Sequence, residues 1–192
     1  MTSPATLPLE LPVPEDDGAC NHLPGMPLAD LELVTTHQTS VNFAAINGDL
    51  VIYIYPMTGR PNVALPDGWA QIPGAMGCTP QACAFRDHYQ ELCKLKATVY
   101  GLSTQTTEYQ SEAASRLQLP FALASDSELK FINSLSLPTM QSNGQTLAKR
   151  VTLVAHDGVI QKVFYPVFPP AENADQVIDY LRNKNNSQGT SV

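Results

Sequence analysis

One near-continuous apolar run constrains the fold of this chain more than any other feature. Residues 49–55 read DLVIYIY, with a single charged residue at the first position. Strands with no polar alternation are typically buried on both faces of a sheet. Strand-like and helix-like segments alternate after this run, as helix 79–95, strand 97–103, helix 106–117, strand 121–125, helix 126–135 and helix 172–184. This order predicts an α/β sandwich around a mixed central sheet.

Two dipeptides predict β-hairpins. Asn47-Gly48 separates VNFAAI from DLVIYIY, and Asp157-Gly158 separates VTLVA from VIQKVFY. Both pairs suit a type I′ turn, in which the two central residues have positive φ. At residues 125–128, Ser-Asp-Ser-Glu resembles a capping box that opens the short helix at 126–135.

The chain of 192 residues is long enough for one well-packed domain. Residues 1–28 are rich in proline and acidic side chains. We expect them to form an extended N-terminal arm that either lies on the domain surface or is partly disordered. Residues 29–186 are predicted to be the folded domain, and 187–192 a polar tail. A long loop at 56–77, with no periodicity of its own, interrupts the domain, and loops of this length are usually functional or disordered.

The charge pattern excludes several partner classes. The net charge is −7 and no basic run occurs, which argues against binding of nucleic acid or of anionic membranes. No apolar stretch reaches the roughly 20 residues that a membrane-spanning helix needs, and the N-terminus lacks the pattern of a signal peptide. A cytoplasmic location is therefore expected, where a close cysteine pair is more often catalytic or metal-binding than a permanent bridge.

Two of the four cysteines, Cys78 and Cys83, lie where this loop gives way to a helix. Thr79 is a plausible N-cap, with Pro80 at the first helical position. Cys78 would then lie at the helix N-terminus, where unpaired N–H groups and the helix dipole favour a thiolate. A thiolate is the form that nucleophilic chemistry requires.

The spacing of Cys78 and Cys83 limits how they could act together. Two Cα atoms five residues apart on an ideal helix are separated by about 8.6 Å. A disulfide tolerates about 7 Å. A bond between them therefore requires the first turns of the helix to unwind, so a structural bridge is disfavoured while a transient one stays possible. A shared metal site is also disfavoured, because the nearby cysteine and histidine side chains point in several directions around one helix.

The remaining candidate residues have less specific surroundings. Cys93 falls on the apolar stripe of the predicted helix, so we expect it in the core. Cys20 lies in the arm without a visible partner. Three isolated histidines are expected to be surface or structural residues: His37, His88 and His156.

The stretch GCTPQACAFRDHYQEL resembles the Q type of the peroxiredoxins, also called the bacterioferritin comigratory protein subfamily. The resemblance continues in register through VIYIYP, through VYGLSTQTTEYQSEAASRLQLPFALASD and through LAKRVTLVAHDGVIQKVFY, and it covers residues 30–185. It implies a thioredoxin-like fold and a thiol peroxidase that acts on hydrogen peroxide or organic hydroperoxides, without a metal or an organic cofactor.

The same resemblance implies roles for single residues. Cys78 would be the peroxidatic nucleophile, and Cys83 would resolve its sulfenic acid as an intramolecular disulfide. Arg150 would hold the thiolate and the peroxide oxygens, while Arg86 and Asp87 would form a flanking ion pair. A thioredoxin- or glutaredoxin-like protein would reduce the disulfide, and the protein would be a monomer or a weak homodimer.

The chain departs from the family pattern Pro-x-x-x-Thr/Ser-x-x-Cys. The position three residues before Cys78 is Ala75, and the strand-end Pro56 and Thr58 are separated from it by the inserted loop 59–76. Either Thr58 folds back to supply the hydroxyl, or backbone groups just before Cys78 replace it. This insertion, which contains the single tryptophan Trp69, could wall the peroxide pocket, set the docking face of the reductant or form an oligomer contact.

Two alternatives to the peroxidase follow from this departure and from the spacing. One is a redox-sensing or binding module with the same fold and little turnover. The other is a thioredoxin-type oxidoreductase, which the Cys-x4-Cys spacing disfavours because Cys-x-x-Cys holds both thiols at one helix start.

Overall fold

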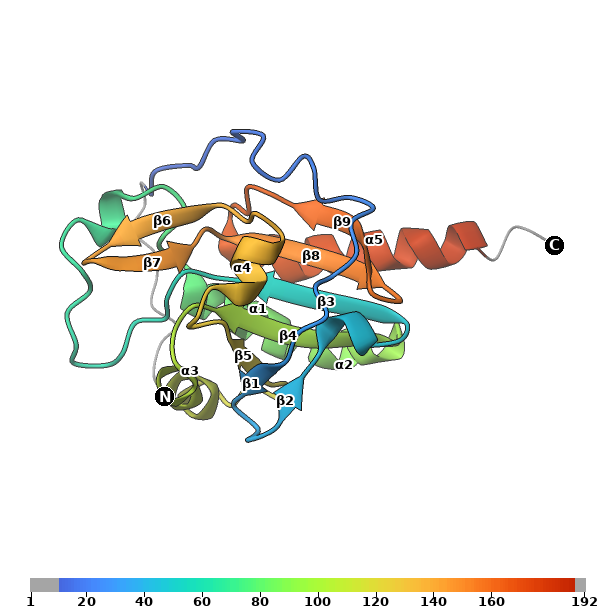
Figure 1. Ribbon diagram of the computed structural model, residues 1–192, viewed down its shortest axis with the longest axis horizontal. Coiled ribbons are helices and arrows are strands. Elements are labelled where there is room, and N and C mark those ends of the chain that lie inside the picture. The colour runs from blue at the N-terminus through green and yellow to red at the C-terminus, as the bar shows by residue number, and fades with distance from the viewer. Residues whose placement is uncertain (1–10, 189–192) are drawn as a thin grey trace.

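A seven-stranded mixed sheet forms the centre of the computed structural model, which describes residues 11–188 (Figure 1). In spatial order its strands are β2 (Ser40–Val41), β1 (Leu33–Thr35), β5 (Leu123–Ser125), β4 (Ala97–Ser103), β3 (Asp49–Ile54), β8 (Val151–His156) and β9 (Val159–Phe164). Strands β3, β4 and β5 run parallel, and the other neighbours are antiparallel. All six residues of β3 are buried, which confirms the predicted central strand and the mixed sheet.

Helices and connecting segments cover both faces of the sheet. They are η1 (Phe43–Ala45), η2 (Trp69–Gln71), α1 (Cys78–Asp87), α2 (Tyr89–Lys94), α3 (Thr107–Arg116), α4 (Lys130–Ser134), η3 (Pro170–Glu172) and α5 (Asn173–Gln188). Alternate residues of β3 point to opposite faces: Val51 and Tyr53 pack with α1 and α5, while Leu50 and Ile52 pack with α4. The active-site candidates lie in the first of these two layers.

Hairpin turns were predicted correctly at one place and wrongly at another. Asp157 and Gly158 have φ of 47° and 75° and join β8 to β9, which confirms that hairpin. Asn47-Gly48 does not form a hairpin, because β3 pairs with β4 on one side and β8 on the other, and no edge is left for residues 41–46. The Gly48 N–H instead donates to the Asp157 carboxylate at 2.7 Å.

A hairpin that the sequence pattern did not predict lies between α4 and β8. Strands β6 (Thr139–Ser142) and β7 (Gln145–Ala148) form a separate two-stranded sheet. Its turn residues Asn143 and Gly144 have φ of 49° and 73°. The same Asn-Gly signal that failed at residue 47 therefore marks a true turn here, because both flanking strands are free to pair.

Two predicted helices differ in their bounds. The helix expected at 79–95 is divided at His88, which has non-helical ψ of 5° and ends α1 before α2 begins. The helix expected at 126–135 is confined to α4. The N-cap is Leu129, and the carboxylate of Asp126 accepts from the N–H groups of Phe131 and Ile132 in the first turn, so the expected capping box with Ser125 is absent from this described helix.

Part of the N-terminal arm belongs to the core. Residues 1–10 of the predicted arm, and 189–192 of the predicted tail, lie outside the described part of the chain. Cys20, Leu23 and Leu28 are buried in the same apolar cluster as β3, while backbone bonds at 25–28 pair the arm with the β8–β9 hairpin. Figure 1 shows the arm, in blue, following that side of the molecule before it enters β1.

No helix within residues 11–188 combines the length and hydropathy that crossing a membrane requires. The described residues also contain no group of three or more side chains that could hold a metal ion.

Candidate active site

Cys78 is the first residue of α1, and Gly77 is its N-cap. The helix therefore begins one residue earlier than predicted, and Thr79 lies inside it. Gly77 has φ of 101°, and a Cβ there would lie 2.6 Å from Cγ of Pro170. Glycine is required for both reasons. No side chain caps the first turn, so the N-terminal N–H groups of α1 stay close to Cys78 without a side-chain partner.

Arg150 reaches Cys78 from the residue just before β8. Its Nη2 lies 3.1 Å from Sγ of Cys78, and each side chain is about 4% exposed. The carbonyls of Gly74, Ala75 and Met76 accept from the same nitrogen at 3.2, 3.3 and 3.1 Å. The loop before Cys78 thus holds the guanidinium with its backbone, and the guanidinium places a fixed positive charge against the sulfur.

Thr58 and Pro56 are buried at the end of β3, but no hydrogen bond joins Thr58 to the sulfur. Within residues 11–188 the hydroxyl of Thr58 has no hydrogen-bond partner, and the Thr58 carbonyl accepts from the Tyr109 hydroxyl at 2.7 Å. The Sγ of Cys78 instead donates to the Ala75 carbonyl at 3.6 Å. This contact is with a backbone carbonyl, which accepts and cannot donate to a thiolate, so the group that replaces the missing threonine stays a prediction.

A buried chain of polar side chains that the sequence did not predict continues from Arg150. Nη1 of Arg150 donates to Oε1 of Gln81, and Nε2 of Gln81 donates to Oδ1 of Asn173 at 2.9 Å. Thr152 donates to the same Oδ1 at 2.7 Å. The sequence held one indication of the role of Gln81: it is a polar residue next to Ala82 on the buried face of α1, where an apolar residue is expected. The sequence held no such indication for Asn173, because it lies 92 residues from Gln81 along the chain.

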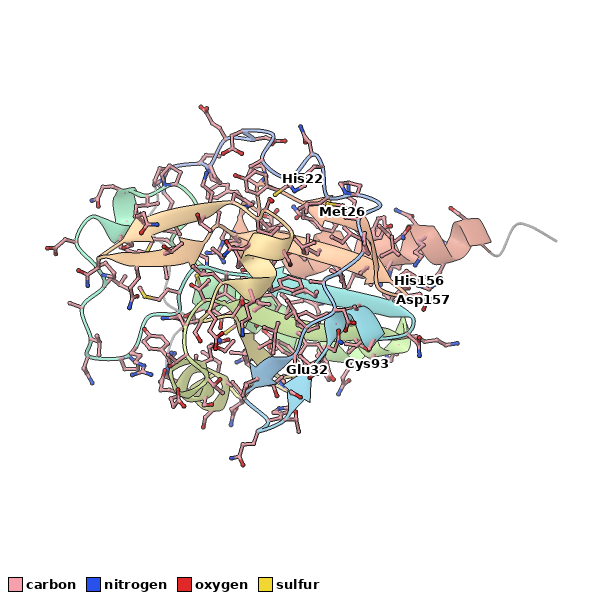
Figure 2. All side chains as sticks on the ribbon, in the orientation of Figure 1. His22, Met26, Glu32, Cys93, His156 and Asp157 are labelled. Carbon is pink, nitrogen blue, oxygen red and sulfur yellow. The ribbon has the colours of Figure 1, made fainter. Side chains whose placement is uncertain are left out.

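Cys83 lies in the same unbroken helix as Cys78 and is half-buried, and both thiols are free. Cys93, expected in the core, is exposed on α2 (Figure 2). That expectation was wrong because the buried stripe of Ala82 and Phe85 continues at Leu92 of α2, while Cys93, the next residue, lies beside this stripe on the exposed side. Arg86 and Asp87 form the predicted ion pair at 2.8 Å.

Two buried tyrosines line the inner side of the site. Burial raises the pKa of Tyr53 and of Tyr55, and the nearby Cys78 adds to both shifts. Tyr55 donates to the Gln110 side chain at 3.0 Å, and the ring of Tyr53 stacks on Phe85 with centroids 4.6 Å apart. These phenols stay neutral at ordinary pH, so they give Cys78 an apolar wall and no competing charge.

The inserted loop folds back on the β6–β7 hairpin. Trp69 is buried, and it packs with Ala75 and with Leu147 of β7. This small cluster fixes the segment whose carbonyls hold Arg150. A cavity of about 420 Å³ lies beside it, between the arm residues 13–17, the loop and Arg150.

Comparisons with known proteins agree with this geometry. A family model described as Redoxin matches residues 23–178. The chloroplastic peroxiredoxin Q of Sedum lineare is 33% identical over 135 residues, which cover 70% of this chain and 63% of that protein. The chain therefore spans less than two thirds of the length of this relative.

Solved structures show the fold. Peroxidoxin BcpB from Mycobacterium tuberculosis superposes with a TM-score of 0.69 and 25% identity, covering 84% of this chain and 98% of that one. A cysteine mutant of PrxQ from Xylella fastidiosa gives a TM-score of 0.70 and 19% identity, covering 85% and 98%. These likenesses confirm the thioredoxin-like fold.

Proposed function

The chain belongs to the Redoxin family, and we propose that it is a thiol-dependent peroxidase for hydrogen peroxide or organic hydroperoxides. The observation that carries the proposal is the contact of Arg150 with Cys78, 3.1 Å from Nη2 to Sγ, at the start of α1. A permanent cation and a helix N-terminus beside a cysteine favour the thiolate over the thiol, and the thiolate is the form that attacks a peroxide.

In the first step, the Cys78 thiolate attacks one peroxide oxygen and the O–O bond breaks. Sulfur is oxidised to a sulfenic acid, and the other oxygen leaves with a proton as water or an alcohol. Arg150 can donate hydrogen bonds where negative charge moves from sulfur to the leaving oxygen. Its Nε is buried and no described residue accepts a hydrogen bond from it, which supports an unfilled donor position on this guanidinium.

In the second step, the thiol of Cys83 attacks the sulfenic sulfur. A disulfide forms between Cys78 and Cys83, and one water leaves. Because both residues belong to α1, this step requires the first turns of the helix to unwind. The absence of a side-chain cap at Gly77 supports such local opening.

A dithiol protein of the thioredoxin or glutaredoxin type then reduces the disulfide and becomes oxidised itself. Electrons pass from that protein to the peroxide through sulfur alone, so the proposal needs no metal or organic cofactor.

One observation favours a second function, a redox-sensing module with little turnover. Ala75 stands where the family has a hydroxyl residue, and the Thr58 hydroxyl makes no hydrogen bond to Cys78. A site without that hydroxyl could oxidise slowly and report on peroxide rather than remove it.

Stopped-flow oxidation of the reduced protein by hydrogen peroxide separates the two functions. Trp69 fluorescence is a suitable signal, because Trp69 packs against Ala75 within the loop before Cys78. Oxidation far faster than that of free cysteine, with a Cys78–Cys83 bond found by mass spectrometry, is the expected result. Oxidation no faster than free cysteine would contradict the peroxidase and favour the sensor.

A further inference from the structure

Asn173 is a polar exception on an otherwise apolar helix face. The residues of α5 that pack with α1 are fully or almost fully buried and apolar: Ala174, Val177, Ile178 and Leu181. Asn173 is also fully buried, and no residue in the described part of the chain bonds its Nδ2. A leucine would avoid that unpaired donor, so packing alone does not account for an asparagine here.

The hydrogen bonds that join Arg150, Gln81 and Asn173 allow only one assignment of donors and acceptors. A guanidinium only donates, so Gln81 has to present Oε1 to Arg150. The Nε2 of Gln81 then points away and needs an acceptor, which is Oδ1 of Asn173. A flip of the Asn173 amide would place Nδ2 against Nε2, two donors facing each other.

Thr152 holds Asn173 in the required orientation. Its hydroxyl donates to Oδ1 at 2.7 Å. Thr152 follows Arg150 by two residues, so both side chains lie on the same face of the chain where it enters β8. The hydrogen bonds therefore form a ring that closes through the backbone between residues 150 and 152. All four of its members are buried: Arg150, Gln81, Asn173 and Thr152.

We propose that Asn173 is a positioning residue that fixes the amide of Gln81 and, through it, the guanidinium of Arg150 against Cys78. This inference rests on the proposed function, because it concerns the cation that holds the reactive sulfur. Asn173 does not touch Cys78, and it acts at two hydrogen bonds' distance from Arg150.

The same ring ties the C-terminal segment to the redox step. Pro170 packs against Gly77, and Asn173 bonds Gln81 one turn further along α1. Both contacts hold the part of α1 that has to unwind before Cys83 can reach Cys78. Asn173 thus supports the reduced site and is released from Gln81 when the disulfide forms.

The test uses the full chain and two measurements. Stopped-flow kinetics give the rate constant of Cys78 oxidation by hydrogen peroxide. Thiolate absorbance at 240 nm, titrated with pH, is recorded for each variant and for the same variant carrying C78S, and the difference belongs to Cys78. Asn173→Leu removes the acceptor, Asn173→Asp keeps it, and Val177→Ala perturbs packing on the same helix face without touching the ring.

Asn173→Leu is expected to lower the oxidation rate constant by up to about tenfold, the upper end of the effect of one lost hydrogen bond between neutral groups. Its thiolate midpoint should move to higher pH. Asn173→Asp should recover most of the rate, and Thr152→Val should show a smaller loss than Asn173→Leu. Val177→Ala should lower the melting temperature and leave both readouts of Cys78 unchanged.

Failure of this inference is distinguishable from failure of the proposed function. If the unmodified protein oxidises no faster than free cysteine, the peroxidase proposal fails, while the pH titration still tests Asn173. If the unmodified protein is fast and Asn173→Leu matches it in rate and thiolate midpoint, the positioning role is overturned. It is equally overturned if Val177→Ala shifts the midpoint as much as Asn173→Leu does.

Discussion

Cys78 and Cys20 are buried almost equally, with 4% and 5% of each residue exposed, yet their surroundings are opposite. Cys78 begins a helix and contacts the guanidinium of Arg150. Cys20 lies in the N-terminal arm, where burial and then the carboxylates of Asp17 and Asp16 raise its pKa to about 12. Burial together with nearby carboxylates therefore keeps a thiol protonated, and a neighbouring cation is what sets the surroundings of Cys78 apart from those of Cys20.

Replacing each cysteine by serine should give the largest difference in activity between Cys78 and Cys20. Cys78→Ser should abolish peroxide reduction, because serine is not oxidised by peroxide under these conditions, whereas Cys20→Ser should leave turnover unchanged. Peroxide consumption in the presence of thioredoxin and its reductase measures both. Comparable loss in the two variants would mean that Cys78 is not the special thiol.

Cys83→Ser should block recycling while sparing the first reaction. The Cys78 sulfenic acid then forms at a near-normal rate but has no internal thiol to attack it, so it accumulates. Stopped-flow kinetics report the first step, and dimedone trapping with mass spectrometry reports the accumulated acid. Cys93→Ser is the matched control, since Cys93 is exposed on α2. Full steady-state turnover of Cys83→Ser would remove its resolving role.

Arg150→Met would make the surroundings of Cys78 more like those of Cys20. We expect the oxidation rate constant to fall on the order of 10²–10³-fold, as for loss of a key electrostatic donor in an active site. Arg86→Met is the control, because the Arg86 guanidinium bonds Asp87 and the Leu117 carbonyl, and no hydrogen bond joins it to Cys78. A loss of equal size in both variants would point to helix stability rather than to the cation.

A smaller change is expected from Cys20 at alkaline pH. Its pKa is raised above the ordinary value of 9.0, so the folded state binds more protons and stability falls as pH rises from about 9 towards 12. Between pH 8 and 10 the protein should lose roughly 1 kcal/mol more of its free energy of unfolding than Cys20→Ala does. Urea unfolding at the two pH values measures this, and equal losses would contradict the raised pKa.

Much of the fold could be predicted from local patterns. Strand β4 was expected at 97–103 and has those bounds, and β3 was expected one residue longer than it is. These strands are continuous apolar segments, so their burial follows from composition. Two Asn-Gly pairs show the limit of such patterns. One closes the β6–β7 hairpin, and the other fails because both edges of β3 are already paired.

The candidate site divides in the same way. Cys78 at a helix start, with Cys83 in the same helix, is local information. The position of Arg150 was expected only through family resemblance. The sequence indicated Gln81 only weakly, as a polar residue on the buried face of a helix, and it did not indicate Asn173 at all. The position of Cys93 was predicted wrongly, because Cys93 lies beside the buried stripe that contains Leu92 and not on it.

Local sequence was thus sufficient for the elements: a buried central strand, the helix that begins at Cys78, and the spacing that forbids a disulfide with Cys83 while that helix is intact. Only the folded chain settles which cation meets the sulfur, which carbonyls and amides hold that cation, and how the arm joins the core. Helix and strand patterns repeat within a few residues, whereas Asn173 and Gln81 are 92 residues apart and meet only because α1 and α5 pack on the same face of one sheet.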